Sequence, residues 1–291
     1  MKVKDKLLTV LAAFMVLLIL AGMGAFKAKG NELKPVATAE NIKVLGGIRN
    51  RMTDNASFVF WQSTIGSKLN NYKSYKNIDE ALCALRSGDI SAMWTCDVTA
   101  DYLCKANDDL FIIPTDKMSA LENTSVDRFE FALAVKDNNE ELVEQLNACI
   151  SDMKSSGVLA ELTDKYIENA VSAVVFSEKD MTCSGSGELV IGVTGAAAPI
   201  ELVDEDGRVY GFCAAFMNEI GARLGKKVRF EVLDGETIFT SLMTGRIDAV
   251  FAYGTGMNTT ENRKNYVMTD GYYSMHSYSF IGCMESSEEN R

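Results

Sequence analysis

The chain has 291 residues, of which 47% are hydrophobic and only three are proline. These values are typical of a folded protein with one large or two ordinary domains, and they exclude an intrinsically disordered chain. A formal net charge of -11 excludes non-specific nucleic-acid binding, which requires a basic surface.

The N-terminus combines basic residues with an apolar run. Three lysines within the first six residues precede an apolar stretch from Leu7 to Phe26. This pattern predicts a secretory signal peptide or an N-terminal membrane anchor over residues 1–30, followed by a polar linker at 31–40. We therefore expect the rest of the chain to be extracytoplasmic, at the cell surface or in a periplasm, with an uncleaved N-terminal helix as one way of anchoring it.

Strands and helices are predicted to alternate over the first half of the chain. Short apolar runs rich in β-branched and aromatic residues predict strands, and longer amphipathic runs predict helices. In chain order we expect strands at Asn41–Ile48 and Phe58–Thr64, a helix and a strand within Asn77–Asp97, a helix at Val98–Ala106, and strands at Leu110–Pro114 and Phe129–Lys136.

The second half continues the alternation. Two helices within Asn139–Ile167 are followed by a Ser- and Gly-rich linker at 177–187. Next come a strand at Glu188–Thr194, a hairpin turning on Asp206–Gly207, a helix at Ala214–Gly225, a strand at Lys227–Leu233, a helix and a strand within Gly235–Thr255, and a closing strand at Tyr272–Gly282. The order predicts an α/β fold with mostly parallel sheets flanked by helices.

Two stretches share the pattern apolar-x-x-Gly-x-Ile-x-Ala-apolar. One copy runs from Leu85 to Trp94 and the other from Leu242 to Phe251. Each is typical of an amphipathic helix that ends at a glycine and is followed by a buried strand. Because the two copies are more than 150 residues apart, they predict two lobes of similar design rather than a solenoid.

Seven cysteines are present, and no two form a CxxC pair. This spacing excludes a CxxC-based zinc site or redox motif, and most of the cysteines lie within apolar runs where they act as small buried side chains. A disulfide between Cys96 and Cys104 is left open by the sequence. No metal-ligand cluster or Gly-rich phosphate loop occurs, so neither a metal nor a cofactor is expected.

The segment from Glu188 to Gly282 resembles the first lobe of bacterial family 3 solute-binding proteins. The matching features are the segment Pro199-Ile200-Glu201, the Asp206-Gly207 turn, the segment Gly211-Phe212-Cys213 and the second copy of the repeat. The family comprises extracytoplasmic amino-acid receptors of ABC importers. The resemblance implies a two-lobed periplasmic-binding-protein-like fold of type II, with a solute cleft between the lobes.

The segment from Tyr75 to Ile167 resembles the family's second lobe and its return into the first. The two halves thus stand in reversed order, which predicts a circular permutation; a fragment of a tandem array is the alternative. On this interpretation residues 41–127 form the lobe equivalent to the family's second, and residues 128–282 form the lobe equivalent to its first. Residues 283–291 form a polar tail.

Candidate solute-binding residues follow the second copy of the repeat, since ligands of open α/β sheets lie at the carboxyl ends of the strands. Hydroxyl, amide and guanidinium groups in this segment can hold a carboxylate. In the family the Arg of this segment clamps the carboxylate, which assigns that role to Arg263. The candidates here are Tyr253, Thr255, Asn258, Thr259, Thr260 and Arg263.

Further candidates follow the first copy and the first strand after the linker. Thr95 and Asp97 flank Cys96, which stands where family members usually place an Asp for the α-ammonium group. Asp97 either supplies that anion from the next position or caps the following helix. Ile200 stands where the family has an aromatic lid, and Glu201 follows it.

The resemblance implies a monomeric receptor that captures a small solute, an amino acid in most of the family, and delivers it to an ABC permease. The alternatives are a membrane-anchored sensor domain and a dehydratase-like enzyme, for which Glu201 is the nearest candidate acid. The single histidine, His276, and Trp94 within a predicted strand are expected to be structural.

Overall fold

The computed structural model describes residues 33–35, 37–38, 40–49, 54–66, 68–114, 129–173, 175–235, 237–254 and 265–286. A compact unit runs from Pro35 to Met284, and residues 1–34 with 285–291 form a separate unit. The predicted signal peptide or anchor lies outside the described residues. Among those that are described, no helix has the length and hydropathy needed to span a bilayer.

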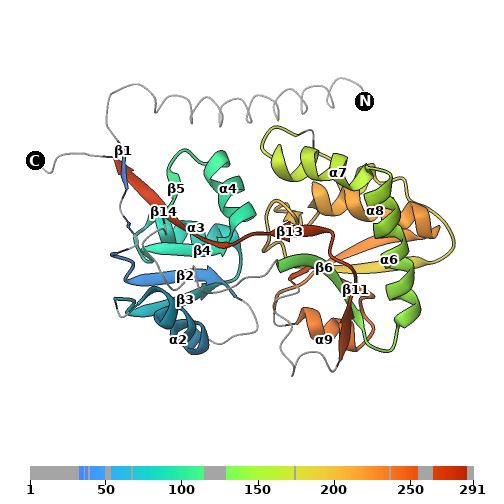
Figure 1. Cartoon of the computed structure of the whole chain (residues 1–291), viewed down its shortest axis with the longest axis horizontal. Coiled ribbons are helices and arrows are strands. Elements are labelled where there is room, and N and C mark those ends of the chain that lie inside the picture. The colour runs from blue at the N-terminus through green and yellow to red at the C-terminus, as the bar shows by residue number, and fades with distance from the viewer. Residues whose placement is uncertain are drawn as a thin grey trace, which may run out of the picture. The chain divides into compact units, whose positions relative to one another are not determined.

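The first sheet combines N-terminal strands with the last strand of the chain (Figure 1). Within the compact unit its order is β14-β4-β2-β3, and β5 also pairs with β14. β2 is parallel to β3 and β4, whereas β14 is antiparallel to β4 and β5. The elements are β1 (Leu33–Pro35), β2 (Val44–Ile48), α2 (Asp54–Ile65), β3 (Asn71–Tyr75), α3 (Ile78–Arg86), β4 (Ala92–Cys96), α4 (Asp97–Ala106), β5 (Leu110–Ile112) and β14 (Tyr278–Ser286).

The second sheet has the order β10-β7-β11-β6-β12, and β13 also pairs with β6. β7 is parallel to β10 and β11, and β6 is antiparallel to β11, β12 and β13. The elements are β6 (Phe129–Lys136), α6 (Glu140–Ser155), α7 (Val158–Thr163), β7 (Glu188–Val193), β8 (Leu202–Val203), β9 (Val209–Tyr210), α8 (Phe212–Leu224), β10 (Lys227–Val232), α9 (Ile238–Met243), β11 (Ala249–Gly254), β12 (Tyr266–Met268) and β13 (Tyr273–Met275).

Both sheets are therefore mixed, not mostly parallel as the alternation of elements predicted. The antiparallel pairs come from β6 and β14, which pair against strands of the helix-linked units. The predicted closing strand is also two strands: β13 pairs in the second sheet and β14 in the first (Figure 1). We expected the lobe that begins at residue 128 to end at Gly282. The chain instead leaves the second sheet after Met275 and enters the first sheet at Tyr278.

The strand predicted at Phe58–Thr64 is not present, because these residues lie within α2, which ends at Ile65. β2 and β3 are parallel neighbours, and a parallel pair requires a crossover connection, usually a helix. Ser57 and Trp61, four residues apart on one helical face, are buried, whereas Val59 and Phe60 are exposed.

The two copies of the repeat do form matching units. α3 ends before Gly88 and α9 before Gly245, and both glycines have positive φ values, 75° and 74°. After each glycine the chain enters a strand parallel to an earlier one, β4 beside β2 and β11 beside β7. The contacts at the entrance also match, because the Ser91 N–H donates to the Val44 carbonyl and the Asp248 N–H to the Val190 carbonyl, both at 2.8 Å.

A glycine in the neighbouring strand explains the isoleucine of the repeat. Ile90 packs over Gly46 of β2, and Ile247 packs over Gly192 of β7. Both isoleucines are 1% exposed. A Cβ on either glycine would collide with the Cδ1 of the isoleucine, so glycine at these positions lets the isoleucine pack directly on the neighbouring strand.

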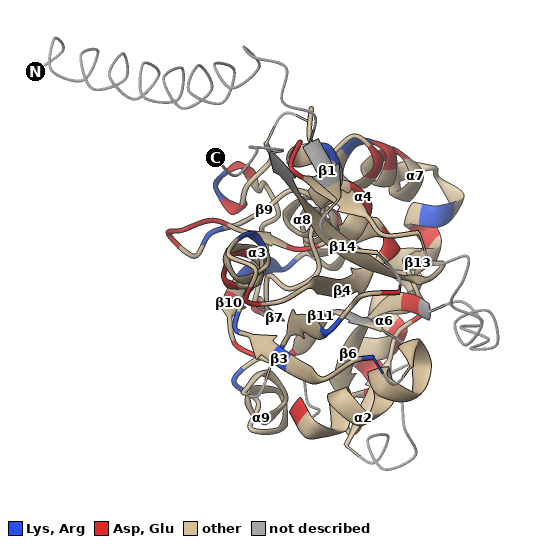
Figure 2. Ribbon diagram, turned by 90° about the vertical axis from the view of Figure 1, so that its left-hand side faces the viewer, with Lys and Arg blue, Asp and Glu red and all other residues tan. Residues whose placement is uncertain are grey.

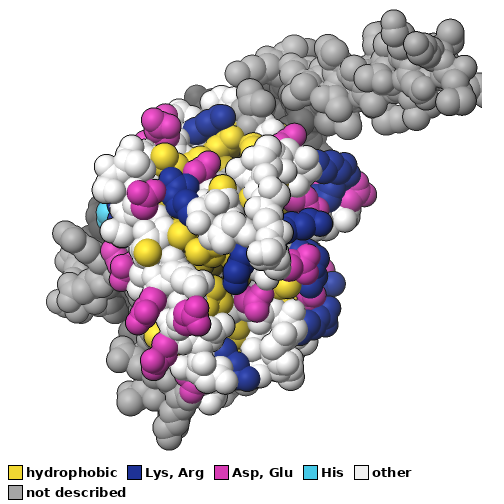
Figure 3. Space-filling view, turned by 90° about the vertical axis from the view of Figure 1, so that its right-hand side faces the viewer, with side chains coloured by type: hydrophobic (Ala, Val, Ile, Leu, Met, Phe, Trp, Pro, Cys, Tyr) yellow, Lys and Arg dark blue, Asp and Glu magenta, His cyan; other side chains and the backbone are white. Residues whose placement is uncertain are grey.

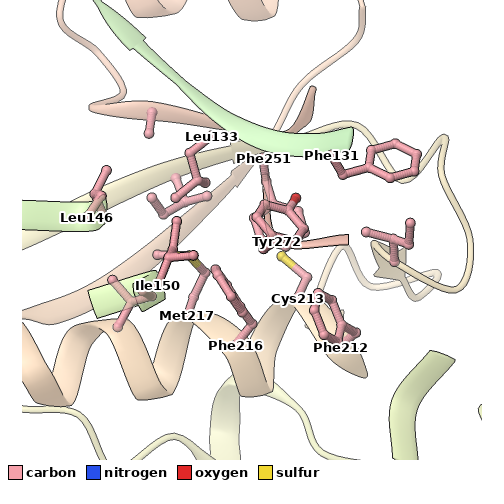
Figure 4. Close-up of a cluster of buried hydrophobic side chains, with 14 of the residues drawn as sticks. Phe131, Leu133, Leu146, Ile150, Phe212, Cys213, Phe216, Met217, Phe251 and Tyr272 are labelled. Carbon is pink, nitrogen blue, oxygen red and sulfur yellow. The ribbon is translucent and has the colours of Figure 1, made fainter. Parts of the chain in front are cut away.

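The largest core cluster lies where α6 and α8 pack against the second sheet. Aromatic rings from α8, β11 and the segment before β13 pack together, with 4.7 Å between the ring centroids of Phe216 and Tyr272 (Figure 4). α6 and α7 are separated at Ser156–Gly157, as the sequence predicted. This core fixes the positions of β7 and β11, the strands whose carboxyl ends carry candidate site residues.

Candidate functional site

The carboxyl ends of the parallel strands define the candidate site. In the second sheet these ends are Val193 of β7 and Gly254 of β11, and in the first sheet they are Ile48 of β2 and Cys96 of β4. β4 and β11 carry no charged residue, and Figure 2 draws their ribbons without charge colours. Charged groups for a solute must therefore come from the segments that follow the strands.

Most candidates after β11 lie outside the described residues. These are Thr255, Asn258, Thr259, Thr260 and Arg263. The backbone of Tyr253 is described and pairs with Ala132 of β6. The ligand role assigned to these residues stays a prediction.

The segment after β7 is held by a buried carboxylate. The Oε2 of Glu201 accepts a hydrogen bond from the Thr194 N–H at 3.2 Å. Its Oε1 accepts the Ala196 N–H at 3.1 Å and the Thr194 hydroxyl. Glu201 is 2% exposed, and burial raises the pKa of its carboxyl while the bonds from Thr194 and Ala196 lower it in part. Glu201 therefore contacts its own turn.

Ile200, expected to cover a solute side chain, has 0% exposure and belongs to the core cluster of the second sheet. Neither Ile200 nor Glu201 presents an accessible surface to a solute in this structure. The sequence analysis did not identify Thr194, whose hydroxyl and N–H both reach Glu201. Its position directly after the strand was the available signal.

The end of β11 is shaped by a tyrosine that the sequence analysis did not single out. The pairing of β11 with β6 shifts register between Val250 and Tyr253, and Ala252 has a φ of 50°, the one positive value for a non-glycine residue among the described residues. The Ala252 N–H donates to the Tyr272 hydroxyl at 2.9 Å. Tyr272 thus fixes the backbone that leads into residues 255–264.

Glu201 and Tyr272 belong to one buried group with Cys213. Burial raises the pKa of the Cys213 thiol well above its ordinary value, and the nearby Glu201 carboxylate adds to this. Burial likewise raises the pKa of Tyr272 well above its ordinary value, with further contributions from Cys213 and Glu201. Figure 4 shows the Cys213 sulfur directed toward the Tyr272 ring. Both side chains are therefore neutral at ordinary pH.

At the end of β4, Thr95 and Cys96 are buried, with 8% and 9% exposure. The Cys96 Sγ lies 3.1 Å from the Thr99 Oγ1, and burial raises the pKa of its thiol. Cys96 therefore offers a neutral group where the resemblance implied an anion.

Asp97 is the first residue of α4, and Cys96 occupies the N-cap position. The Oδ1 of Asp97 accepts the Val98 N–H at 2.8 Å. Its Oδ2 accepts the N–H groups of His276 at 2.8 Å and Ser277 at 3.2 Å. Both carboxylate oxygens are thus engaged with backbone, and one of them binds the chain between β13 and β14.

Trp94 makes contacts that stabilise the fold, whereas the cysteines are free. The Trp94 indole N–H donates to the Tyr72 hydroxyl at 2.9 Å, and Trp94 packs against Trp61 and Tyr278. All seven cysteines are free, so Cys96 and Cys104 are not paired. Within the described ranges no cluster of His, Cys, Asp or Glu could hold a metal ion.

Cavities lie beside α4 and at the amino ends of β7 and β11. One of about 330 Å³ lies beside α4, the segment Ile167–Val171 and the side chains of Tyr273 and His276, with Asp97 in its wall. The other, of about 550 Å³, lies at the amino ends of β7 and β11 near Asn139 and Arg223, away from the candidate site. The molecular face in Figure 3 intersperses acidic and basic side chains.

Comparison with protein families decides the relationship. Residues 189–282 match the model of bacterial extracellular solute-binding proteins, family 3. The match covers about a third of the chain. It includes the segments Pro199-Ile200-Glu201, Asp206-Gly207 and Gly211-Phe212-Cys213, on which the resemblance was based. The expected α/β class, with two sheets flanked by helices, is confirmed.

Among solved structures, the chain is similar to the GluR0 ligand-binding core from Nostoc punctiforme in complex with L-glutamate. The identity is 12%, the alignment covers 84% of this chain and 86% of that one, and the TM-score is 0.41. It is also similar to the arginine-bound form of domain 1 from TmArgBP of T. maritima, with 27% identity over 32% of this chain and 79% of that chain and a TM-score of 0.27.

The L-cystine solute receptor of Neisseria gonorrhoeae, in its unliganded open conformation, shows 28% identity over 26% of this chain and 32% of that chain, with a TM-score of 0.24. No curated protein matches the chain.

Proposed function

We propose that this family 3 segment is part of an extracytoplasmic solute-binding protein that captures a small solute between two lobes. The observation that supports this is the pair of matching helix–glycine–strand units. Each places the carboxyl end of one strand beside that of a parallel neighbour, β4 beside β2 and β11 beside β7. Two such edges, one on each sheet, provide the two sides of a binding cleft, and hinge motion closes them.

The proposed solute is an amino acid, with its carboxylate held by Arg263 and the hydroxyl and amide groups of residues 255–260. An Arg clamp suits a carboxylate because its guanidinium donates two parallel hydrogen bonds. The proposed partner is a membrane permease of an ABC importer. The proposed receptor is a monomer that binds the solute and does not convert it chemically. We also propose that the chain is a circular permutation, because the segments that resemble the family's two lobes stand in reversed order.

Thermal shift tests this function. L-glutamate, L-arginine and L-cystine are each added to the purified chain, and succinate is added in parallel as a carboxylate without an amine. A solute at about 100 times its dissociation constant stabilises the fold by about 2.7 kcal/mol. A shift with at least one amino acid, confirmed by calorimetry at one solute per chain, supports the proposal. No shift with these three amino acids, or with the other common amino acids added in the same way, would contradict the amino-acid assignment.

A further inference from the structure

We propose that Glu201 is a positioning residue for solute binding: it acts from beneath the site by fixing the turn Thr194–Ala196 at the carboxyl end of β7. This inference rests on the function proposed above. It reassigns Glu201, because a side chain that is 2% exposed does not contact a solute directly.

The first step of the argument is the set of donors around the carboxylate. Glu201 accepts two backbone N–H groups and one hydroxyl, and all three donors are neutral. Removing a carboxylate from water is costly unless hydrogen bonds replace the lost hydration. Every one of these replacement bonds comes from the single turn that follows β7. The cost of burial is thus coupled to the conformation of that turn.

The second step is the backbone of the turn. Thr194 lies beyond the last paired residue of β7, so its N–H and that of Ala196 have no partner in the sheet. An N–H group that is shielded from water and has no partner destabilises the fold. Glu201 satisfies both groups, and its own N–H donates to the Ala197 carbonyl at 2.9 Å, which closes the loop on itself. The turn is therefore preorganised before any solute arrives.

The third step links the turn to the neighbouring strand. β11 is the parallel neighbour of β7, and the Tyr272 hydroxyl accepts a hydrogen bond from the Ala252 N–H in β11. Hydrogen bonds to Glu201 and to Tyr272 thus fix two adjacent strand ends, one after β7 and one in β11.

The experiment compares Glu201→Gln and Thr194→Val with the control Asp248→Asn. Gln keeps the shape of Glu but replaces one accepting oxygen by an NH₂ group, and Val removes only the hydroxyl of Thr194. Asp248 is a matched control because its Oδ2 accepts the Val190 N–H at 2.7 Å near the opposite end of β7. The first measurement is backbone amide exchange by NMR at Thr194 and Ala196.

The second measurement is calorimetric affinity for the amino acid that gives the largest thermal shift with the unmodified chain. We expect both site variants to speed exchange at Thr194 and Ala196 and to lower affinity about tenfold or more, equal to about 1.4 kcal/mol. The Asp248→Asn variant should keep its affinity within about twofold even if its melting temperature falls.

Three results would overturn the inference. Unchanged affinity in a folded Glu201→Gln or Thr194→Val chain with faster exchange would show that the turn does not matter for binding. An equal loss in Asp248→Asn would assign the effect to general destabilisation. If the unmodified chain binds no amino acid, the proposed function fails first, and the inference fails with it. The thermal-shift screen separates this case from the other two.

Discussion

The carboxylate of Asp97 accepts the backbone N–H of His276 at 2.8 Å, although the two residues are 179 positions apart in the chain. This bond ties the first turn of α4 to the chain that leaves the second sheet and enters the first. Asp97 thus stands at the junction between a candidate binding position and the segment that connects β13 to β14. Its substitution is expected to affect both stability and solute preference.

For Asp97→Asn we expect a loss of about 0.5–1.5 kcal/mol in the free energy of unfolding, because one exposed backbone N–H exchanges its accepting oxygen for water. Urea denaturation followed by tryptophan fluorescence measures this. The same variant tests the ammonium site: thermal shifts with amino acids that vanish in Asp97→Asn would show that Asp97 holds the amine. Shifts with succinate alone would overturn the amino-acid assignment and retain the binding-protein function.

Arg263→Ala is expected to weaken solute binding by about 2–4 kcal/mol if Arg263 pairs with a desolvated carboxylate. Isothermal titration calorimetry with the bound amino acid measures the change. Arg223→Ala is a suitable comparison, since Arg223 pairs with Asp152 and Glu219 beside the cavity at the amino ends of the strands. A change of less than about half a log unit for Arg263→Ala would assign Arg263 to the surface.

Glu201 predicts a specific pH dependence of stability. Its folded pKa is raised above the ordinary value of 4.5, so the protonated carboxyl favours the folded state relative to the charged one. This contribution is fully present below pH 4.5 and is lost as pH rises through the raised pKa. The unfolding free energy of the unmodified chain minus that of Glu201→Gln should therefore decrease with rising pH in this window. Urea titrations at several pH values test this, and a difference that increases with pH would contradict it.

Cys213→Asp should be strongly destabilising, by about 3 kcal/mol or more, because it places a second carboxyl in a fully buried position beside Glu201. The loss should shrink as pH falls and the new carboxyl becomes protonated. Cys83→Asp on the exposed face of α3 is the control and should cost little. A stable Cys213→Asp chain would show that the buried group adapts to a charge.

Gly46→Ala is expected to lower stability by about 1–3 kcal/mol, since the added methyl group collides with the Cδ1 of Ile90. The double variant Gly46→Ala with Ile90→Val removes that carbon and should recover part of the loss. Gly192→Ala with Ile247→Val repeats the test in the other copy of the pattern. If Ile90→Val adds its own loss without any recovery, the collision is not the cause.

The sequence predicted those features that depend on local pattern. The helix–glycine–strand units, the hairpin at Asp206–Gly207 and the break between α6 and α7 all occur where periodicity and glycine placed them. The prediction of a strand at Phe58–Thr64 was wrong because an apolar stretch of this length fits either a strand or a helix. The helix is required here because β2 and β3 are parallel neighbours, and no local sequence pattern reveals that pairing.

The candidate site was less accessible to prediction because its contacts join distant segments. The sequence left open whether Asp97 caps a helix. The N-cap is Cys96, Asp97 is the first residue of α4, and its partners His276 and Ser277 lie near the far end of the chain. Tyr272 matters through a hydroxyl that reaches Ala252 across a strand irregularity. The burial of Ile200 and Glu201 follows from the fold of the turn after β7, and motif position alone did not indicate it.

The strand order of the second sheet has a consequence for how the chain can be divided. β6 precedes the Ser- and Gly-rich segment 177–187, whereas its partners β11, β12 and β13 all follow it. A cut in that segment would leave the two pieces interleaved within one hydrogen-bonded sheet, with β14 also pairing to β4 of the earlier piece. The halves, expressed from two separate genes, should therefore assemble by fragment complementation, each supplying strands that the other cannot replace.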